Sequence, residues 1–95
     1  MKTKVEETSL KLFLTNGVTL TVKESEKITK HGEPVDIIWL MDYIEDCLAE
    51  KKPVVFNVTI NHKYLDEKEK EKSQEVKHRY IIPCEKISWY MLEEV

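Results

Sequence analysis

The sequence predicts a small α+β domain in which a curled antiparallel sheet carries one amphipathic helix on one face. Three observations predict it. Apolar and polar residues alternate with a period of two along much of the chain, one central segment places its apolar residues at helical spacing, and the connections between these segments are short. The predicted order is strand, strand, helix, strand, strand, strand.

Ninety-five residues with 41% hydrophobic and 35% charged side chains are typical of one globular domain. A chain of this length can build a single hydrophobic core and has no room for a second. We therefore expect one domain over residues 1–95. Residues 1–7 are polar, so we expect them to be frayed.

The first two strands are predicted to form a hairpin around residues 15–17. The Asn-Gly pair is a strong hairpin signal, but a two-residue loop would place Leu14 opposite Thr19. A three-residue loop instead pairs Leu14 with Val18 and gives the hairpin one wholly apolar face. It also leaves Gly17 free to take a left-handed conformation, so we predict the three-residue loop.

A charged connection over residues 24–33, which either extends the second strand or is irregular, leads to a predicted helix over residues 34–50. Pro34 suits the first helical position, and Pro53 ends the segment. The apolar residues that share one side at helical spacing are Ile37, Leu40, Met41, Ile44, Cys47 and Leu48. Ile38 and Trp39 widen this stripe, so a buried strand over residues 35–41 is the alternative.

Two strands in the second half of the chain flank a charged segment. Residues 54–61 alternate between apolar and polar side chains, and the alternation returns over residues 76–82. Residues 63–75 between them are nearly all Lys and Glu. Such a mixed-sign run is typical of an exposed loop or a short exposed helix, and we predict a charged exposed loop here.

The closing segment predicts a sharp bend in the sheet. Pro83 ends a strand because proline cannot donate to the ladder, residues 84–86 make a short turn, and residues 87–92 form a last strand. This strand–turn–strand resembles the end of Sm-type barrels, and strong curling would make the sheet a small SH3-like or Sm-like barrel. Sm-type barrels carry their helix before the first strand, whereas the helix predicted here follows the second.

Charge and motifs argue against several classes of function. The net charge of -3 argues against general nucleic-acid binding, which needs clustered Lys and Arg. Gly17 and Gly32 are the chain's two glycines, too few for a phosphate-binding loop, and no HExxH, CxxC or GxSxG motif occurs. We therefore predict that the protein is not an enzyme and has no catalytic residues, cofactor or metal site.

Cysteine usage and hydropathy predict a cytoplasmic protein. The separation of Cys47 and Cys84 matches no zinc or redox motif, which favours two reduced thiols. The longest apolar run, residues 37–41, is far too short to span a membrane, and no signal peptide is expected at the start of the chain.

The predicted helix offers one candidate surface for a partner. Asp42, Glu45 and Asp46 lie at positions i, i+3 and i+4, so they share a face, and no Lys or Arg lies among the acidic residues of the helix. This face suits a basic protein partner, such as one that normally binds nucleic acid. The alternative interpretation is a solvated outer face.

The last strand offers a second candidate surface. Adjacent strand residues point to opposite sides, so placing Trp89 in the core leaves Tyr90 and Leu92 pointing outward. On a terminal edge strand these two side chains would suit partner binding or self-association. The alternative is that the helix or the N-terminal segment covers them.

His78, Arg79 and Tyr80 are candidate ligand contacts because they combine polar and stacking groups. The leading hypothesis is a non-enzymatic binding or accessory protein that acts through a sheet edge and a helix surface, for example an inhibitor or adaptor of a bacterium or phage. The alternative is a homo-oligomer that binds a small ligand or nucleotide in a pocket between protomers.

Overall fold

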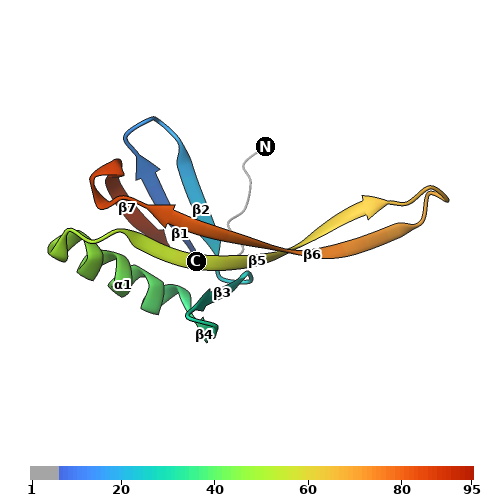
Figure 1. Cartoon of the computed structure of the whole chain (residues 1–95), viewed down its shortest axis with the longest axis horizontal. Coiled ribbons are helices and arrows are strands. Elements are labelled where there is room, and N and C mark those ends of the chain that lie inside the picture. Colours follow the sequence, from blue (N-terminus) through green and yellow to red (C-terminus); the bar gives the residue numbers. More distant parts are fainter. Residues whose placement is uncertain (1–6) are drawn as a thin grey trace.

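Two antiparallel sheets and one helix make up residues 7–95, the part of the chain that the computed structural model describes (Figure 1). The first sheet has the strand order β2-β1-β7, and the second has the order β4-β3-β5-β6. In chain order the elements are β1 (Ser9–Leu14), β2 (Thr19–Lys23), β3 (Lys27–Lys30), β4 (Glu33–Val35), α1 (Ile37–Glu50), β5 (Val54–Leu65), β6 (Glu71–Ile82), a 3-10 turn (Cys84–Lys86) and β7 (Ile87–Glu93).

The α+β class and the antiparallel pairing are confirmed, but the single curled sheet is not. The described residues form two separate sheets and no closed barrel. The difference between one sheet and two arises in residues 24–33, where the sequence predicted an irregular connection or an extension of the second strand rather than a separate hairpin. His31 and Gly32 both adopt positive φ, 54° and 78°, and this tight turn pairs β3 with β4.

The first hairpin has the predicted register. Leu10 pairs with Val22 and Leu12 with Leu20, so the apolar residues face one another. The N–H of Leu14 donates to the carbonyl oxygen of Val18 at 2.9 Å, which closes the three-residue loop. Gly17 has φ +87°, a conformation that other residues adopt only with strain. The expected fraying of residues 1–7 falls almost entirely on residues 1–6, which lie outside the described residues.

The central segment is a helix, so the alternative of a buried strand over residues 35–41 is wrong. The helix begins at Ile37 rather than Pro34 because Asp36 caps it, its carboxylate accepting a hydrogen bond from the N–H of Trp39 at 2.7 Å. Pro34 lies in β4 instead. At the other end Lys51 takes a left-handed conformation, and the N–H of Lys52 donates to the carbonyl oxygen of Cys47 at 2.8 Å.

Residues 63–75 are not a loop but the end of a long hairpin. β5 continues to Leu65 and β6 begins at Glu71, and the carboxylate of Asp66 organises the turn by accepting from the N–H groups of Lys68 and Lys70 at 2.9 and 2.8 Å. We call residues 61–75 the arm. The arm extends away from the rest of the fold (Figure 1), and the fold with the arm included measures 51 × 37 × 26 Å along its principal axes.

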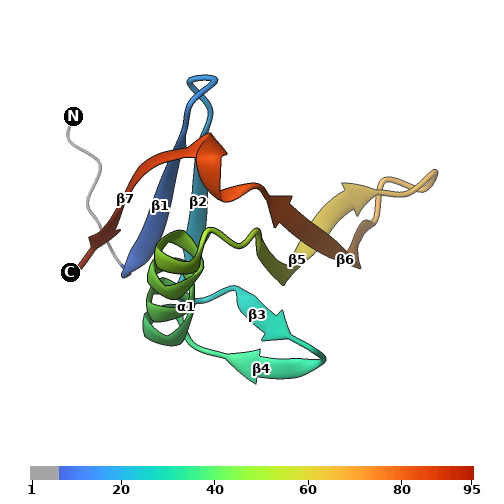
Figure 2. The same cartoon turned by 60° about the vertical axis from the view of Figure 1, so that its left-hand side comes forward.

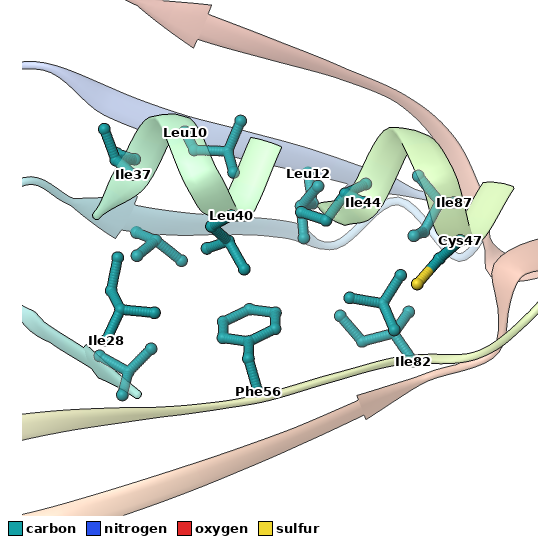
Figure 3. Packing of buried hydrophobic residues seen from close by; sticks show 13 residues of the cluster. Leu10, Leu12, Ile28, Ile37, Leu40, Ile44, Cys47, Phe56, Ile82 and Ile87 are labelled. Atoms are coloured by element: carbon teal, nitrogen blue, oxygen red, sulfur yellow. The ribbon is translucent and has the colours of Figure 1, made fainter. Parts of the chain in front are cut away.

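One hydrophobic core lies among the two sheets and α1. Figure 3 shows Phe56 of β5 pointing toward α1, with Leu40 opposite it. Both side chains are fully buried. The buried apolar residues are Leu10, Leu12, Val22, Ile28, Ile37, Leu40, Ile44, Cys47, Val54, Phe56, Val58, Ile82 and Ile87.

Candidate binding surfaces

The outer face of α1 combines acidic side chains with two exposed apolar ones. Its inner side packs into the core, and the opposite side carries Asp42, Glu45 and Asp46, all exposed as the sequence predicted. Ile38 and Trp39 lie on this outer side with 47% and 42% of their surface exposed. The helix contains no Lys or Arg. We call these five residues the acidic helix face.

Tyr43 of α1, which contacts the second sheet, supports Trp39. The indole stacks on the ring of Tyr43 with the ring centroids 5.3 Å apart and the planes 16° from parallel. The ammonium of Lys30 in turn lies over the ring of Tyr43, 4.7 Å from the ring centroid. The Tyr43 hydroxyl accepts a hydrogen bond from the N–H of Val55 at 3.1 Å. Trp39 is therefore exposed on a supported surface, where less side-chain freedom is lost when a partner binds.

A β-bulge in β7 reverses the predicted orientation of its side chains. Leu14 pairs with Ile87 and Phe13 with Trp89, so Ser88 is an extra residue between two consecutive pairs. The extra residue shifts the alternation by one position. Ile87 is buried, Trp89 is 53% exposed, and Tyr90 packs against the core.

The prediction that Trp89 joins the core while Tyr90 and Leu92 point outward is therefore wrong. Leu92, like Tyr90, is partly buried and packs against the core. Trp89 instead stacks on Phe13 of β1, with the ring centroids 3.7 Å apart and the planes 7° from parallel. The indole of Trp89 thus covers a neighbouring strand rather than the core.

Tyr90 lies beside the acidic helix face. Partial burial raises the pKa of its hydroxyl, and the carboxylates of Glu45 and Asp42 raise it further because they repel the charged phenolate. Of the five predicted partner contacts, Tyr90 of β7 thus lies near enough to Glu45 and Asp42 of α1 for their charges to act on it. Tyr90 forms the edge of this surface rather than its centre, because it is partly buried and packs against the core.

The fold does not bring His78, Arg79 and Tyr80 together. Strand alternation puts His78 and Tyr80 on the core-facing side of β6 and Arg79 on the other side. The Tyr80 hydroxyl and His78 Nδ1 are 3.5 Å apart, and the Tyr80 ring lies 5.3 Å from that of Phe56. Burial raises the pKa of Tyr80, with a smaller contribution from Glu26.

Arg79 instead lines a shallow depression at the point where β3 leaves β5. Lys30 at the end of β3, His31 after it, and Val55, Phe56 and Asn57 of β5 line it as well, and its volume is about 180 Å3. No acidic residue lines it. Sequence reasoning missed Lys30, His31 and Asn57 because they lie far from Arg79 in the chain and follow no local motif.

Comparison of the chain with protein-family models, curated proteins and solved structures finds no match. Within residues 7–95, no helix has the length and apolar character needed to cross a membrane.

Proposed function

We propose that this protein is a non-enzymatic binding protein whose acidic helix face docks a basic protein partner. The observation that carries the proposal is the exposure of Trp39 and Ile38 on a helix surface that is otherwise acidic. Large exposed apolar side chains surrounded by polar residues are typical of interaction sites. Tryptophan is among the residues that contribute most to binding energy at the centres of interfaces.

The charges of the surface define the class of partner. Asp42, Glu45 and Asp46 are exposed and lie on one face, and among the described residues none of them forms an ion pair. Carboxylates at the rim of an interface mainly accelerate association with a positively charged surface and select against negatively charged ones. Lys or Arg side chains on the partner would pair with these carboxylates while the indole enters an apolar site.

An inhibitor or adaptor from a bacterium or phage could act through such a face. By covering a basic surface of its partner, the acidic helix face would compete with any nucleic acid that binds the same surface. This mode of action requires no catalytic group. It places the binding function on α1 rather than on a cleft.

A pair of synthetic peptides tests the proposal. They are amphipathic helices of equal length with the same apolar residues, one carrying lysines and the other glutamates at the polar positions. We expect the lysine peptide alone to bind, with an affinity that falls as salt is added. Trp39→Ala should weaken binding about tenfold or more, and D42N/E45Q/D46N should remove most of the salt dependence. Titration calorimetry measures both effects.

Two exposed acidic residues in the turn of the arm provide a matched control. E67Q/E69Q removes two of the charges of the chain from a different surface, against three for D42N/E45Q/D46N. If that control weakens binding as much as D42N/E45Q/D46N, binding reflects net charge and the helix face is not the site. Equal binding of the two peptides, or no effect of Trp39→Ala, would also contradict the proposal.

Binding of a small anionic ligand is the second candidate function, favoured by the depression that His31 and Arg79 line and that no acidic residue lines. Phosphate and nucleotides are the probes, and thermal unfolding is the measurement. A ligand at 100 times its dissociation constant should stabilise the fold by about 2.7 kcal/mol. Arg79→Gln should abolish the shift and Lys77→Gln, on the same strand but outside the depression, should leave it unchanged. Absence of any shift would count against this candidate.

A further inference from the structure

The outer edge of β6 is a long strand edge without a neighbour among the described residues. β6 is the last strand in the order β4-β3-β5-β6 and spans 12 residues. Strands in globular proteins usually have about 3–10 residues. A free edge presents a row of unpaired N–H and carbonyl groups, which can pair with another strand.

The arm itself has only two strands. β3 pairs with β5 at Lys27–Thr59, Ile28–Val58 and Thr29–Asn57 and reaches no further along it. From Ile60 outward, β5 and β6 therefore pair with each other alone (Figure 2). A two-stranded hairpin is marginally stable in water, so an added strand would stabilise this part of the fold.

The charges of β6 select one self-pairing register. When two copies of a strand pair antiparallel about a two-fold axis, the residue at the axis lies opposite its own copy. The residue before it in one copy then lies opposite the residue after it in the other copy. Centring the pair on Glu75 or on Lys77 brings like charges together. Centring it on Val76 puts valine against valine and places Glu75 opposite Lys77 on both sides of the axis.

Three other registers are worse. Centring the pair on His78 sets Lys77 against Arg79, and centring it on Ser73 sets Glu71 against Glu75. Centring it on Gln74 creates no repulsion but pairs residues 71–77 only, whereas centring it on Val76 pairs residues 71–81. The Val76 register therefore combines the longest ladder with complementary charges.

We propose that two copies of this chain pair through β6, antiparallel about a two-fold axis at Val76. The two four-stranded sheets then join into one continuous sheet. The β6 part of each arm lies along residues 77–81 of the other copy, so the arm gains the third strand that it lacks in one chain. This interface is separate from the acidic helix face, so either proposal can fail without the other.

Charge reversal at the two opposed positions tests the register. The oligomeric state of the full chain is measured by analytical ultracentrifugation over a range of concentrations. We expect a dimer for the unaltered chain. Glu75→Lys alone and Lys77→Glu alone each set like charges against each other twice, and each should weaken the dimer roughly tenfold or more.

Two rescue experiments test whether restoring opposite charges at the two positions restores the dimer. The swapped chain E75K/K77E should dimerise again, because opposite charges face each other with their positions exchanged. A mixture of E75K chains with K77E chains should form heterodimers, although each chain alone does not dimerise well. Lys27→Glu is the matched control, since Lys27 is exposed on the same sheet but is separated from β6 by β5.

A monomeric unaltered chain at all concentrations would overturn the proposal. A dimer that both single reversals leave unchanged would overturn the β6 register. Failure of the swapped chain and of the mixture to dimerise, while circular dichroism shows that the single variants are folded, would overturn the pairing of Glu75 with Lys77. Equal weakening by Lys27→Glu would also overturn it.

Discussion

The hydroxyl of Tyr43 on α1 accepts a hydrogen bond from the backbone N–H of Val55 at the start of β5, with 3.1 Å between oxygen and nitrogen. The last pair between β3 and β5 is Thr29–Asn57, so Val55 lies beyond the point where β3 leaves its neighbour. The hydroxyl on α1 satisfies a backbone donor there. One side chain thus connects α1 to the second sheet and at the same time supports the exposed indole of Trp39.

Removal of this hydroxyl should destabilise the fold. Tyr43→Phe keeps the ring that stacks on Trp39 but leaves the partly buried N–H of Val55 without its partner. We expect the free energy of unfolding to fall by about 1–2 kcal/mol, measured by urea denaturation. Tyr64→Phe, in the exposed arm, should change it by less than about 0.5 kcal/mol. Equal effects of the two substitutions would mean that the hydrogen bond contributes nothing.

The stacked rings of Phe13 and Trp89 should stabilise the first sheet. Trp89→Ala removes an aromatic pair across β1 and β7, and we expect a loss of about 1–2 kcal/mol in the free energy of unfolding. Trp89→Phe retains an aromatic ring and should recover part of the loss. Ile81→Ala is the control, because Ile81 is 63% exposed. If Trp89→Ala is as mild as Ile81→Ala, the stacking is energetically neutral.

Phe56 is the largest fully buried side chain of the core. Phe56→Ala leaves a cavity between β5 and α1 and should cost about 3–5 kcal/mol, measured by chemical denaturation. Leu65→Ala, at a residue with 68% of its surface exposed, should change stability by no more than about 0.5 kcal/mol. A cost below about 1 kcal/mol at Phe56 would contradict the assignment of this face of β5 to the core.

Tyr90 should make the stability of the fold sensitive to alkaline pH. Its pKa is raised in the folded state, so the phenol stays neutral there while the unfolded chain ionises near its ordinary pKa of about 10. The stabilising contribution is fully present below that ordinary value and is lost as the pH rises through the folded value. Tyr90→Phe should therefore reduce the alkaline fall in stability, measured by thermal unfolding at a series of pH values.

The acidic residues beside Tyr90 give a second measurement of the same effect. D42N/E45Q removes the two nearby carboxylates, and the Tyr90 pKa measured by NMR should move down toward the ordinary tyrosine value. Burial, the larger cause, remains, so the shift should not vanish. Glu67→Gln in the distant turn is the control and should leave the Tyr90 pKa unchanged. No change with D42N/E45Q would show that the helix carboxylates do not act on Tyr90.

The parts of the fold with strong periodicity could be predicted from the sequence. Only one loop length aligned the apolar residues of β1 with those of β2, and helical spacing identified the buried side of α1. β3 and β4 were missed because strands of four and three residues are too short to show a period. The arm was missed because an exposed two-stranded ribbon has the same charged composition as a loop.

The candidate site was predictable on the helix and not on the strands. Helix periodicity alone was enough to predict that Asp42, Glu45 and Asp46 are exposed. In β7 the bulge at Ser88 reversed the faces of Tyr90 and Trp89, and no residue in that strand signals an inserted position. The depression around Arg79 depends on where β3 ends, which the sequence pattern did not define.

The pairing of β1 with β7 constrains the order in which the protein can fold during synthesis. β1 lies between β2 and β7, and Ser9 pairs with Glu93 near the other end of the chain. While the ribosome is still adding the later residues, β1 can pair with β2 but its other edge stays open. The three-stranded sheet can close only after β7 has emerged from the exit tunnel, because contacts between distant parts of a chain form late.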